Sequence, residues 1–360
     1  MLLQPFQLGG QGLANRVVMA PMTRTRADDN RNPTDLMRIY YEQRASAGLI
    51  ITECTAVRED SAGIFHAPGI YSEAQVDGWS KITRAVHAAG GKIFLQLWHC
   101  GRISHPSLQP GGERPIAPSA IAAKGQLHTA SGRVDYLTPR ALELSEIGPL
   151  IEAFGAGARN ARRAGFDGVE LHGAFGYLPE QFLKDGTNTR TDAYGGSVPN
   201  RARFMLEVVE AMIGAWGSER VGVKLSPSST FYGQSDSNAL QTYSYVTKTL
   251  EGLGVGYIHV MEPNPDDLKT GSVLEHPTRD LRQVFRGTVI TNGGYDKEKG
   301  EAALREGTAD LVSYAAKFIA NPDLPRRFAE DAPLNEGDYA TFYGSGPKGY
   351  IDYPTLTGAS

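Results

Sequence analysis

Short runs of β-branched and other apolar residues recur along the chain, and each is bounded by Gly, Pro or polar residues. Such runs are typical of strands that are buried on both faces of a sheet. The runs lie at residues 17–20, 49–53, 93–97, 168–172, 221–225, 257–260, 289–292 and 311–314. The pattern therefore predicts eight buried strands.

Longer segments with helical periodicity separate these strands. They cover residues 33–47, 73–89, 145–164, 198–216, 238–253 and 296–306. One apolar stripe extends over about three turns of the third segment and consists of Ile147, Leu150, Ile151, Phe154 and Ala158. Because an open sheet rarely has eight strands in strict alternation with helices, the order predicts an α/β protein with a (β/α)8, or TIM, barrel. We expect residues 1–360 to form one barrel domain.

The connection between the third and fourth predicted strands is the longest between neighbouring strands. Within it, residues 101–140 are rich in Pro, Gly and Ser, which predicts an excursion that caps the C-terminal mouth of the barrel. A second segment, 344–349, matches the dinucleotide pattern G-x-G-x-x-G. No apolar run precedes it and Pro347 would interrupt a helix, so we expect a loop there.

The net charge and the cysteine content argue against several classes of function. The 36 Lys and Arg against 40 Asp and Glu give a net charge of −4, which argues against nucleic-acid binding and against anionic membrane surfaces. The two cysteines, Cys54 and Cys100, form no disulfide framework, and no apolar run is long enough to span a bilayer. A pair of histidines, His99 and His105, lacks a third spaced metal ligand. We expect a cytoplasmic protein without a metal.

Polar residues gather where the predicted strands end, which is where (β/α)8 enzymes carry their reacting groups. These ends include Thr23, Gln96, His172, Lys224 and Asn292. Any one of them alone is more often structural, and Trp98 alone is as compatible with core packing as with the mouth. Together they favour an enzyme with a polar cofactor, since the Gly293-Gly294 turn can present backbone N–H groups to a phosphate. The residues alone leave the reaction open.

Longer motifs accompany these strand ends. They are Ala14-Asn-Arg-Val17, Ala20-Pro-Met-Thr-Arg24, Tyr40-Tyr-Glu-Gln-Arg-Ala45, Leu95-Gln-Leu-Trp-His-Cys-Gly-Arg102, Gly176-Tyr-Leu-Pro-Glu-Gln-Phe-Leu-Lys-Asp185, Arg190-Thr-Asp-Ala-Tyr-Gly-Gly-Ser197, Asn200-Arg201, Phe318-Ile-Ala-Asn-Pro-Asp-Leu324 and Gly349-Tyr-Ile-Asp-Tyr-Pro354. Through them the chain resembles the old yellow enzyme family of flavin-dependent ene-reductases along nearly its whole length. The resemblance implies a barrel that holds FMN, which NAD(P)H reduces and which passes hydride to an activated alkene.

The resemblance also implies roles for individual residues. Tyr177 would protonate the substrate's α-carbon as a general acid, and His172 would be the first of two donors to its carbonyl oxygen. Thr23 would contact the flavin O4 atom, and Gln96 the pyrimidine edge. Further cofactor positions are Pro21, Met22, Cys54, Lys224, Asn292, Gly293, Gly294, Ala315 and Ala316. The substrate pocket would be lined by Phe65, Trp98, Phe175 and Tyr350, beside His172 and Tyr177.

The sequence departs from the family pattern at several of these positions. The second carbonyl donor is replaced by Phe175, which cannot donate, and the loss of one such donor costs about 2.7–4 kcal/mol of transition-state stabilisation. Lys224 stands where the family has an Arg near the flavin, so the charge remains without the planar fork. Ala315-Ala316 replaces the Gly-Arg pair that binds the phosphate, with Lys317 as the adjacent cation.

Three hypotheses follow. In the first, the protein is an FMN-dependent ene-reductase with unusual substrate demands. In the second, weakened or lost flavin binding leaves Tyr177 and His172 to isomerise or cyclise a carbonyl compound. In the third, the barrel is catalytically silent and binds a ligand or partner, although a retained phenol at position 177 argues against it. The first two imply a small-molecule substrate, an activated alkene or a carbonyl compound, while oligomeric state and the choice between NADH and NADPH stay open.

Overall fold

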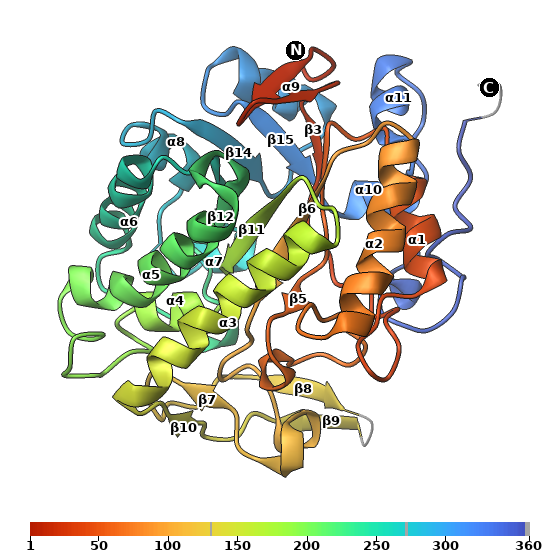
Figure 1. Cartoon of the computed structure of the whole chain (residues 1–360). Helices are drawn as coiled ribbons and strands as arrows, with labels where there is room; N and C mark the ends of the chain where they lie inside the picture. Colours follow the sequence, from red (N-terminus) through yellow and green to blue (C-terminus); the bar gives the residue numbers. More distant parts are fainter. Residues whose placement is uncertain (130–131, 271–272, 357–360) are drawn as a thin grey trace.

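The computed structural model describes residues 1–129, 132–270 and 273–356, and a closed barrel of parallel strands forms its centre (Figure 1). The barrel strands are β3 (Val17–Met19), β4 (Leu49–Ile51), β6 (Ile93–Trp98), β11 (Gly168–Gly173), β12 (Val221–Leu225), β13 (Tyr257–Met261), β14 (Thr288–Asn292) and β15 (Leu311–Tyr314). The pairing of β15 with β3 and of β6 with β11 closes the ring. The predicted barrel and all eight of its strands are confirmed, with ends that differ by at most two residues.

The N-terminal end of the barrel interior is apolar. It is filled by Val18, Leu49, Ile51, Phe94, Tyr257, Ile290 and Leu311. Two further members of this cluster, Leu8 and Leu13, come from the hairpin of β1 (Phe6–Leu8) and β2 (Gln11–Leu13). The hairpin therefore covers the N-terminal end of the barrel and leaves the other end for the site (Figure 1).

Helices surround the barrel, as the periodicity predicts. The larger ones are α1 (Asp35–Glu42), α2 (Glu73–Ala88), α3 (Leu144–Arg163), α5 (Val198–Trp216), α6 (Ala239–Leu253) and α9 (Lys297–Arg305). The helix α2 begins at a capping box, because Ser72 accepts from the Gln75 N–H while the Gln75 side chain accepts from Ser72. The first helix is shorter than the predicted 33–47, since Arg44 turns inward to donate to the carbonyls of Phe318 and Ile319.

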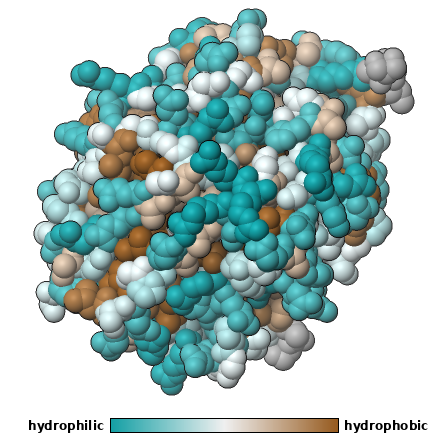
Figure 2. All heavy atoms as spheres, in the orientation of Figure 1, coloured by the Kyte–Doolittle hydropathy of each residue, from teal (hydrophilic) through white to brown (hydrophobic). Residues whose placement is uncertain are grey.

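Shorter helices complete the chain. They are α4 (Leu178–Leu183), α7 (Pro265–Leu268), α8 (Pro277–Arg282), α10 (Ala316–Ala320) and α11 (Leu324–Ala329), with single 3-10 turns at Glu59–Ser61, Pro106–Leu108, Pro110–Gly112, Ser218–Arg220, Phe231–Gly233 and Tyr339–Thr341. On the face that Figure 2 shows, most side chains are hydrophilic and the apolar ones form small patches.

The excursion after β6 carries four short strands, β7 (Ile116–Ala117), β8 (Gln126–Thr129), β9 (Gly132–Asp135) and β10 (Arg140–Ala141). It lies at the end of the molecule opposite the β1–β2 hairpin (Figure 1). Its residues Leu108, Leu127 and Tyr136 pack into one cluster with Trp98 and Tyr177. The excursion therefore covers part of the C-terminal mouth, as predicted.

The segment 344–349 forms bends and turns, and the element directly before it is a 3-10 turn rather than a strand. The side chains of Arg24 and Arg26 donate to its carbonyls and to those just before it. The predicted loop is confirmed. Across the part of the chain that the structure describes, no helix combines the length and apolarity needed to cross a membrane.

Candidate active site

A cavity of about 390 Å³ opens at the C-terminal ends of the barrel strands. Most of the predicted site residues lie in its wall, namely Pro21, Met22, Thr23, Cys54, Gln96, His172, Phe175, Tyr177, Lys224, Ala315 and Ala316. The structure thus brings together side chains that are separated by almost 300 positions in the sequence. The wall also includes residues that the sequence did not single out, namely Arg24, Ile64, Phe231, Tyr232, Ile319, Phe342 and Tyr343.

A second cavity of about 340 Å³ adjoins the first and shares Ala315 and Ala316 with it. It contains the remaining predicted cofactor positions Asn292, Gly293 and Gly294, and also Lys317. Gly293 has a φ of 110°, a conformation that favours glycine, and a Cβ atom there would lie 3.2 Å from Glu262. The turn can therefore bring bare backbone to a ligand, with the Lys317 side chain beside it.

A chain of buried polar contacts lies under the main cavity, inside the barrel. The Gln96 amide donates to Glu170 Oε1 at 2.8 Å, and Glu170 Oε2 lies 2.9 Å from His259 Nδ1. The other ring nitrogen of His259 lies 2.7 Å from Ser313 Oγ. Every member is buried. Because each side chain is oriented by the next, Gln96 is fixed in direction before any ligand binds.

Lys224 supplies the positive charge in this polar floor of the cavity. Its Nζ lies 3.4 Å from Asn292 Oδ1. Burial lowers the pKa of Lys224 to about 8, although the nearby Glu170 carboxylate opposes this shift. Burial and the positive charge of Lys224 hold the pKa of His172 well below its usual range, so that His172 is a neutral imidazole.

Tyr177, His172 and Trp98 form an aromatic corner. The Tyr177 ring is nearly perpendicular to both others, with centroids 4.7 Å from His172 and 5.3 Å from Trp98. Burial raises the pKa of Tyr177 well above its ordinary value, so the phenol stays protonated and can act as an acid. Within the described residues, His172 Nδ1 and Trp98 Nε1 are buried without a hydrogen-bond partner. Because His172 lines the cavity, its unpaired ring nitrogen indicates that a ligand can bind at this corner, whereas Trp98 lies outside the wall.

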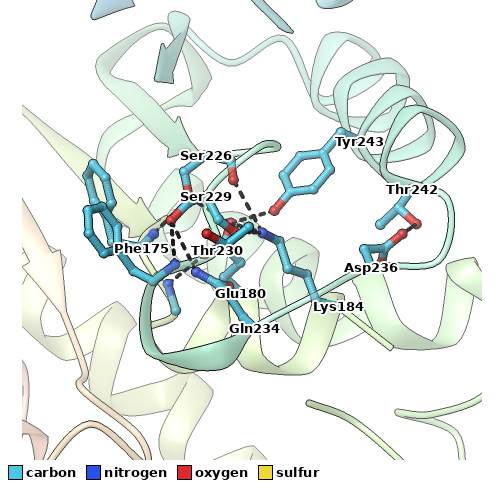
Figure 3. Close-up of polar contacts among 12 residues, drawn as sticks. Phe175, Glu180, Lys184, Ser226, Ser229, Thr230, Gln234, Asp236, Thr242 and Tyr243 are labelled. Atoms are coloured by element: carbon cyan, nitrogen blue, oxygen red, sulfur yellow. Dashed lines mark hydrogen bonds and ion pairs between the residues drawn. The ribbon is translucent and has the colours of Figure 1, made fainter. Parts of the chain in front are cut away.

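The turn that carries Phe175 is held by hydrogen bonds to its backbone (Figure 3). The Phe175 N–H donates to Ser226 Oγ at 2.8 Å, and the Gly176 N–H donates to Glu180 Oε2 at 2.6 Å. Phe175 adopts a φ of 54°, which a large side chain rarely takes. Its ring centre lies 6.0 Å from that of His172 and 5.5 Å from Lys224 Nζ. The position therefore offers an aromatic face to the cavity and no donor.

Three residues that we expected in the pocket wall lie elsewhere. Trp98 lies behind Tyr177 and outside the wall, because its ring fills the core cluster under the excursion. Tyr350 is buried against Tyr40, with ring centres 4.2 Å apart. Phe65 lines a separate hollow beside Asp29 and Tyr71, and its neighbour Ile64 faces the cavity instead.

Tyr350 nevertheless affects the wall indirectly. Its ring lies 5.1 Å from the guanidinium of Arg24 and 4.6 Å from that of Arg26. These two arginines hold the backbone of residues 341–349, from which Phe342 and Tyr343 reach the cavity. No local sequence pattern indicates this contact, because its partners are more than 300 positions apart.

Comparison with known proteins identifies the family. The model of the NADH:flavin oxidoreductase / NADH oxidase family matches residues 1–335. The chain is 44% identical to 12-oxophytodienoate reductase 1 of Oryza sativa subsp. japonica, over 99% of this chain and 93% of the relative. A probable flavin mononucleotide-dependent alkene reductase of Leishmania infantum is 43% identical over 99% of this chain and 98% of its own length.

Solved structures of similar proteins indicate the same family. Morphinone reductase superposes with a TM-score of 0.94 at 46% identity, covering 99% of this chain and 96% of the other. The old yellow enzyme homologue from Zymomonas mobilis superposes with a TM-score of 0.94 at 44% identity, covering 99% of both chains. The protein therefore belongs to the NADH:flavin oxidoreductase family, which is the old yellow enzyme family.

Proposed function

We propose that the protein is an FMN-dependent reductase that uses NADH or NADPH to reduce the C=C bond of activated alkenes. The observation that carries this proposal is the pair of joined cavities, with a neutral His172 and a protonated Tyr177 on one wall and a polar floor beneath. When bound, FMN supplies hydride transfer from the nicotinamide to the double bond. Of the three hypotheses, the family relationship supports this one.

The residues present fit FMN. Thr23, Gln96 and Lys224 line the main cavity and would hold the polar edges of a flavin ring there. Gly293, Gly294 and Lys317 line the second cavity, where a phosphate would lie. Lys317 is the cation available at that end, because Ala316 carries no charge.

His172 and Tyr177 act on the substrate. His172 orients the alkene by donating to the oxygen of its activating carbonyl group. Tyr177 delivers the proton that the α-carbon needs. Phe175 adds no donor, so the substrate has one hydrogen bond to its oxygen in place of two. We therefore expect a preference for alkenes with strong electron-withdrawing groups, which depend less on the enzyme for activation.

The protein would work in the cytoplasm on a small molecule. Its two cysteines, Cys54 and Cys100, are both free and buried, which suits a reducing compartment.

Visible absorption of the purified protein tests this function. We expect a flavin band that remains after FMN is added in excess and the protein is desalted. NADH or NADPH should bleach this band under anaerobic conditions, and an activated alkene should restore it. A protein that never retains FMN, or whose flavin is not reoxidised by any activated alkene, would contradict the proposal.

A further inference from the structure

Two polar side chains of the cavity wall, those of Thr23 and Cys54, lie in direct contact. The pairing of β3 with β4 aligns Met19 with Ile50, and each of the two side chains stands four positions beyond one of these residues. The parallel register therefore continues past the strand ends, and it places Thr23 Oγ1 3.1 Å from Cys54 Sγ. Both residues line the main cavity.

The residues next to this pair fix the backbone on both sides. The Arg24 N–H donates to Glu53 Oε2 at 3.1 Å, so the residue after Thr23 is tied to the residue before Cys54. Glu53 is itself held by Tyr41, whose hydroxyl donates to Glu53 Oε1 at 3.2 Å. The contact between Thr23 and Cys54 therefore belongs to an arrangement that is in place before a ligand binds.

Cys54 offers a thiol to this contact and not a thiolate. Its side chain is 4% exposed, and burial raises the pKa of Cys54 to about 12. The neutral thiol has one proton to donate. Within the described residues, the hydroxyl of Thr23 is its only side-chain hydrogen-bond partner.

The direction of the hydrogen bond follows from the ligand that the cavity would hold. A hydroxyl has one proton and can still accept hydrogen bonds. In the proposed function, Thr23 would meet a carbonyl oxygen at the edge of the flavin ring, and such an oxygen only accepts. The Thr23 proton then points to the flavin, which leaves the Thr23 oxygen to accept the thiol proton of Cys54. In such a chain each hydrogen bond strengthens the next.

We propose that Cys54 tunes the reduction potential of the bound flavin by donating its thiol proton to Thr23. Reduction adds electrons to the flavin ring and increases the negative charge on its carbonyl oxygens. A Thr23 hydroxyl that is polarised by Cys54 stabilises this charge more strongly, and no covalent bond breaks. Cys54 acts through Thr23 and is a positioning residue. The inference rests on the proposed function, because the tuning needs a bound flavin.

The variants Cys54→Ala and Cys54→Ser test the tuning through the midpoint potential of the bound flavin, measured against a reference dye. Cys54→Ala removes the donor, so the potential should fall by about 15 mV, which is an about threefold change in the equilibrium constant of a two-electron couple. Cys54→Ser supplies a stronger donor and should raise the potential. Cys100→Ala removes the other buried thiol, which lies outside the cavity wall, and should leave the potential unchanged. An unchanged or raised potential in Cys54→Ala would overturn the inference.

A second measurement needs no flavin. The chain has only two cysteines, so the S–H stretching band of Cys54 can be assigned in the infrared spectrum of the flavin-free protein by comparison with Cys54→Ala. A thiol that donates to Thr23 absorbs at a lower frequency, so Thr23→Val should shift this band upward. The band of Cys100 should not move. A Cys54 band that does not respond to Thr23→Val would also overturn the inference. A protein that retains no FMN would contradict the proposed function, while the infrared band still reports on the contact.

Discussion

Phe175 and Lys224 determine the character of the cavity at the residue scale. The Phe175 ring centre lies 5.5 Å from Lys224 Nζ, and such a contact is worth about 0.5–2 kcal/mol, depending on desolvation. A donor at position 175 would add a second hydrogen bond to the substrate oxygen, whereas an aromatic face stabilises the buried cation. Hydrogen bonding to the substrate oxygen is thereby left to His172.

Replacing Phe175 with Asn should increase activity on simple cyclic enones. Asn supplies the missing donor, and it adopts a positive φ more readily than Phe, so the strain at φ 54° also decreases. We expect kcat to rise by up to about 10²-fold, the effect of one such donor. Steady-state kinetics of Phe175→Asn beside Phe231→Asn would check this, because Phe231 lines the same wall. An equal gain in both variants would show that the effect is not specific to position 175.

Lys224 should make the stability of the flavin-free protein depend on pH. Its pKa is lowered from 10.5 to about 8 by burial, so between these values the unfolded chain binds more protons and stability rises with pH. Lys224→Met should therefore be more stable than the wild type near pH 7, by up to about 3 kcal/mol. The difference should shrink as the pH rises from about 8 towards 10.5. Urea unfolding across this range measures it, and a constant difference would contradict the shift.

At the scale of elements, α4 joins the two loops that shape the substrate side of the cavity. Glu180 is completely buried and accepts hydrogen bonds from Gly176, Ser226 and Tyr243, with Lys184 opposite (Figure 3). These contacts fix the turn after β11 against the loop after β12. A helix of fewer than two turns thereby positions both loops.

Glu180→Gln should destabilise the protein by about 3–5 kcal/mol, because the Lys184 ammonium is left buried without its counter-ion. Glu152→Gln is a suitable control, since Glu152 pairs with Arg159 on the surface, where such a change costs less than about 1 kcal/mol. Denaturant unfolding of both variants makes the comparison. Equal losses of stability in the two variants would show that the buried ion pair contributes no more than the surface pair.

The helix α10 begins at the second cavity and carries Lys317. Lys317→Ala should weaken FMN binding about tenfold and riboflavin binding little, because only FMN has a phosphate for this cation to meet. Lys297→Ala is the control, since Lys297 pairs with Asp331 and lines only the adjoining hollow. Fluorescence titration measures both affinities. An equal loss of both ligands in Lys317→Ala would place Lys317 away from the phosphate.

The sequence predicts the helices and strands better than it predicts the loops that line the cavity. Each barrel strand is a buried apolar run that can be recognised without knowledge of its partners. The strand ends therefore predict that Thr23, Gln96, His172 and Lys224 lie close together, and all four line the cavity. Tyr232 and Tyr343 come from loops whose paths depend on distant contacts, such as that of Arg102 with the Tyr232 carbonyl. Phe65 and Tyr350 were placed by resemblance in positions that the loops of this chain do not give them.

At the scale of the whole molecule, three segments outside the barrel complete the site. The loop after β12 supplies Phe231 and Tyr232 to the cavity wall, and residues 341–349 supply Phe342 and Tyr343. The excursion supplies Tyr136, which lies outside the wall and packs against Tyr232. The barrel floor carries the polar groups, and the added segments bring mainly aromatic rings. The polar and the aromatic parts of the cavity therefore come mainly from different layers of one fold.

The contact between Arg24 or Arg26 and residues 341–349 also has a consequence for biosynthesis. The two arginines follow the first barrel strand, whereas their carbonyl partners are translated after the last one. Folding during synthesis proceeds from the N-terminus. The cavity wall is therefore completed only when all eight strands have left the ribosome, and enclosure of a cofactor is a late event in the maturation of this protein.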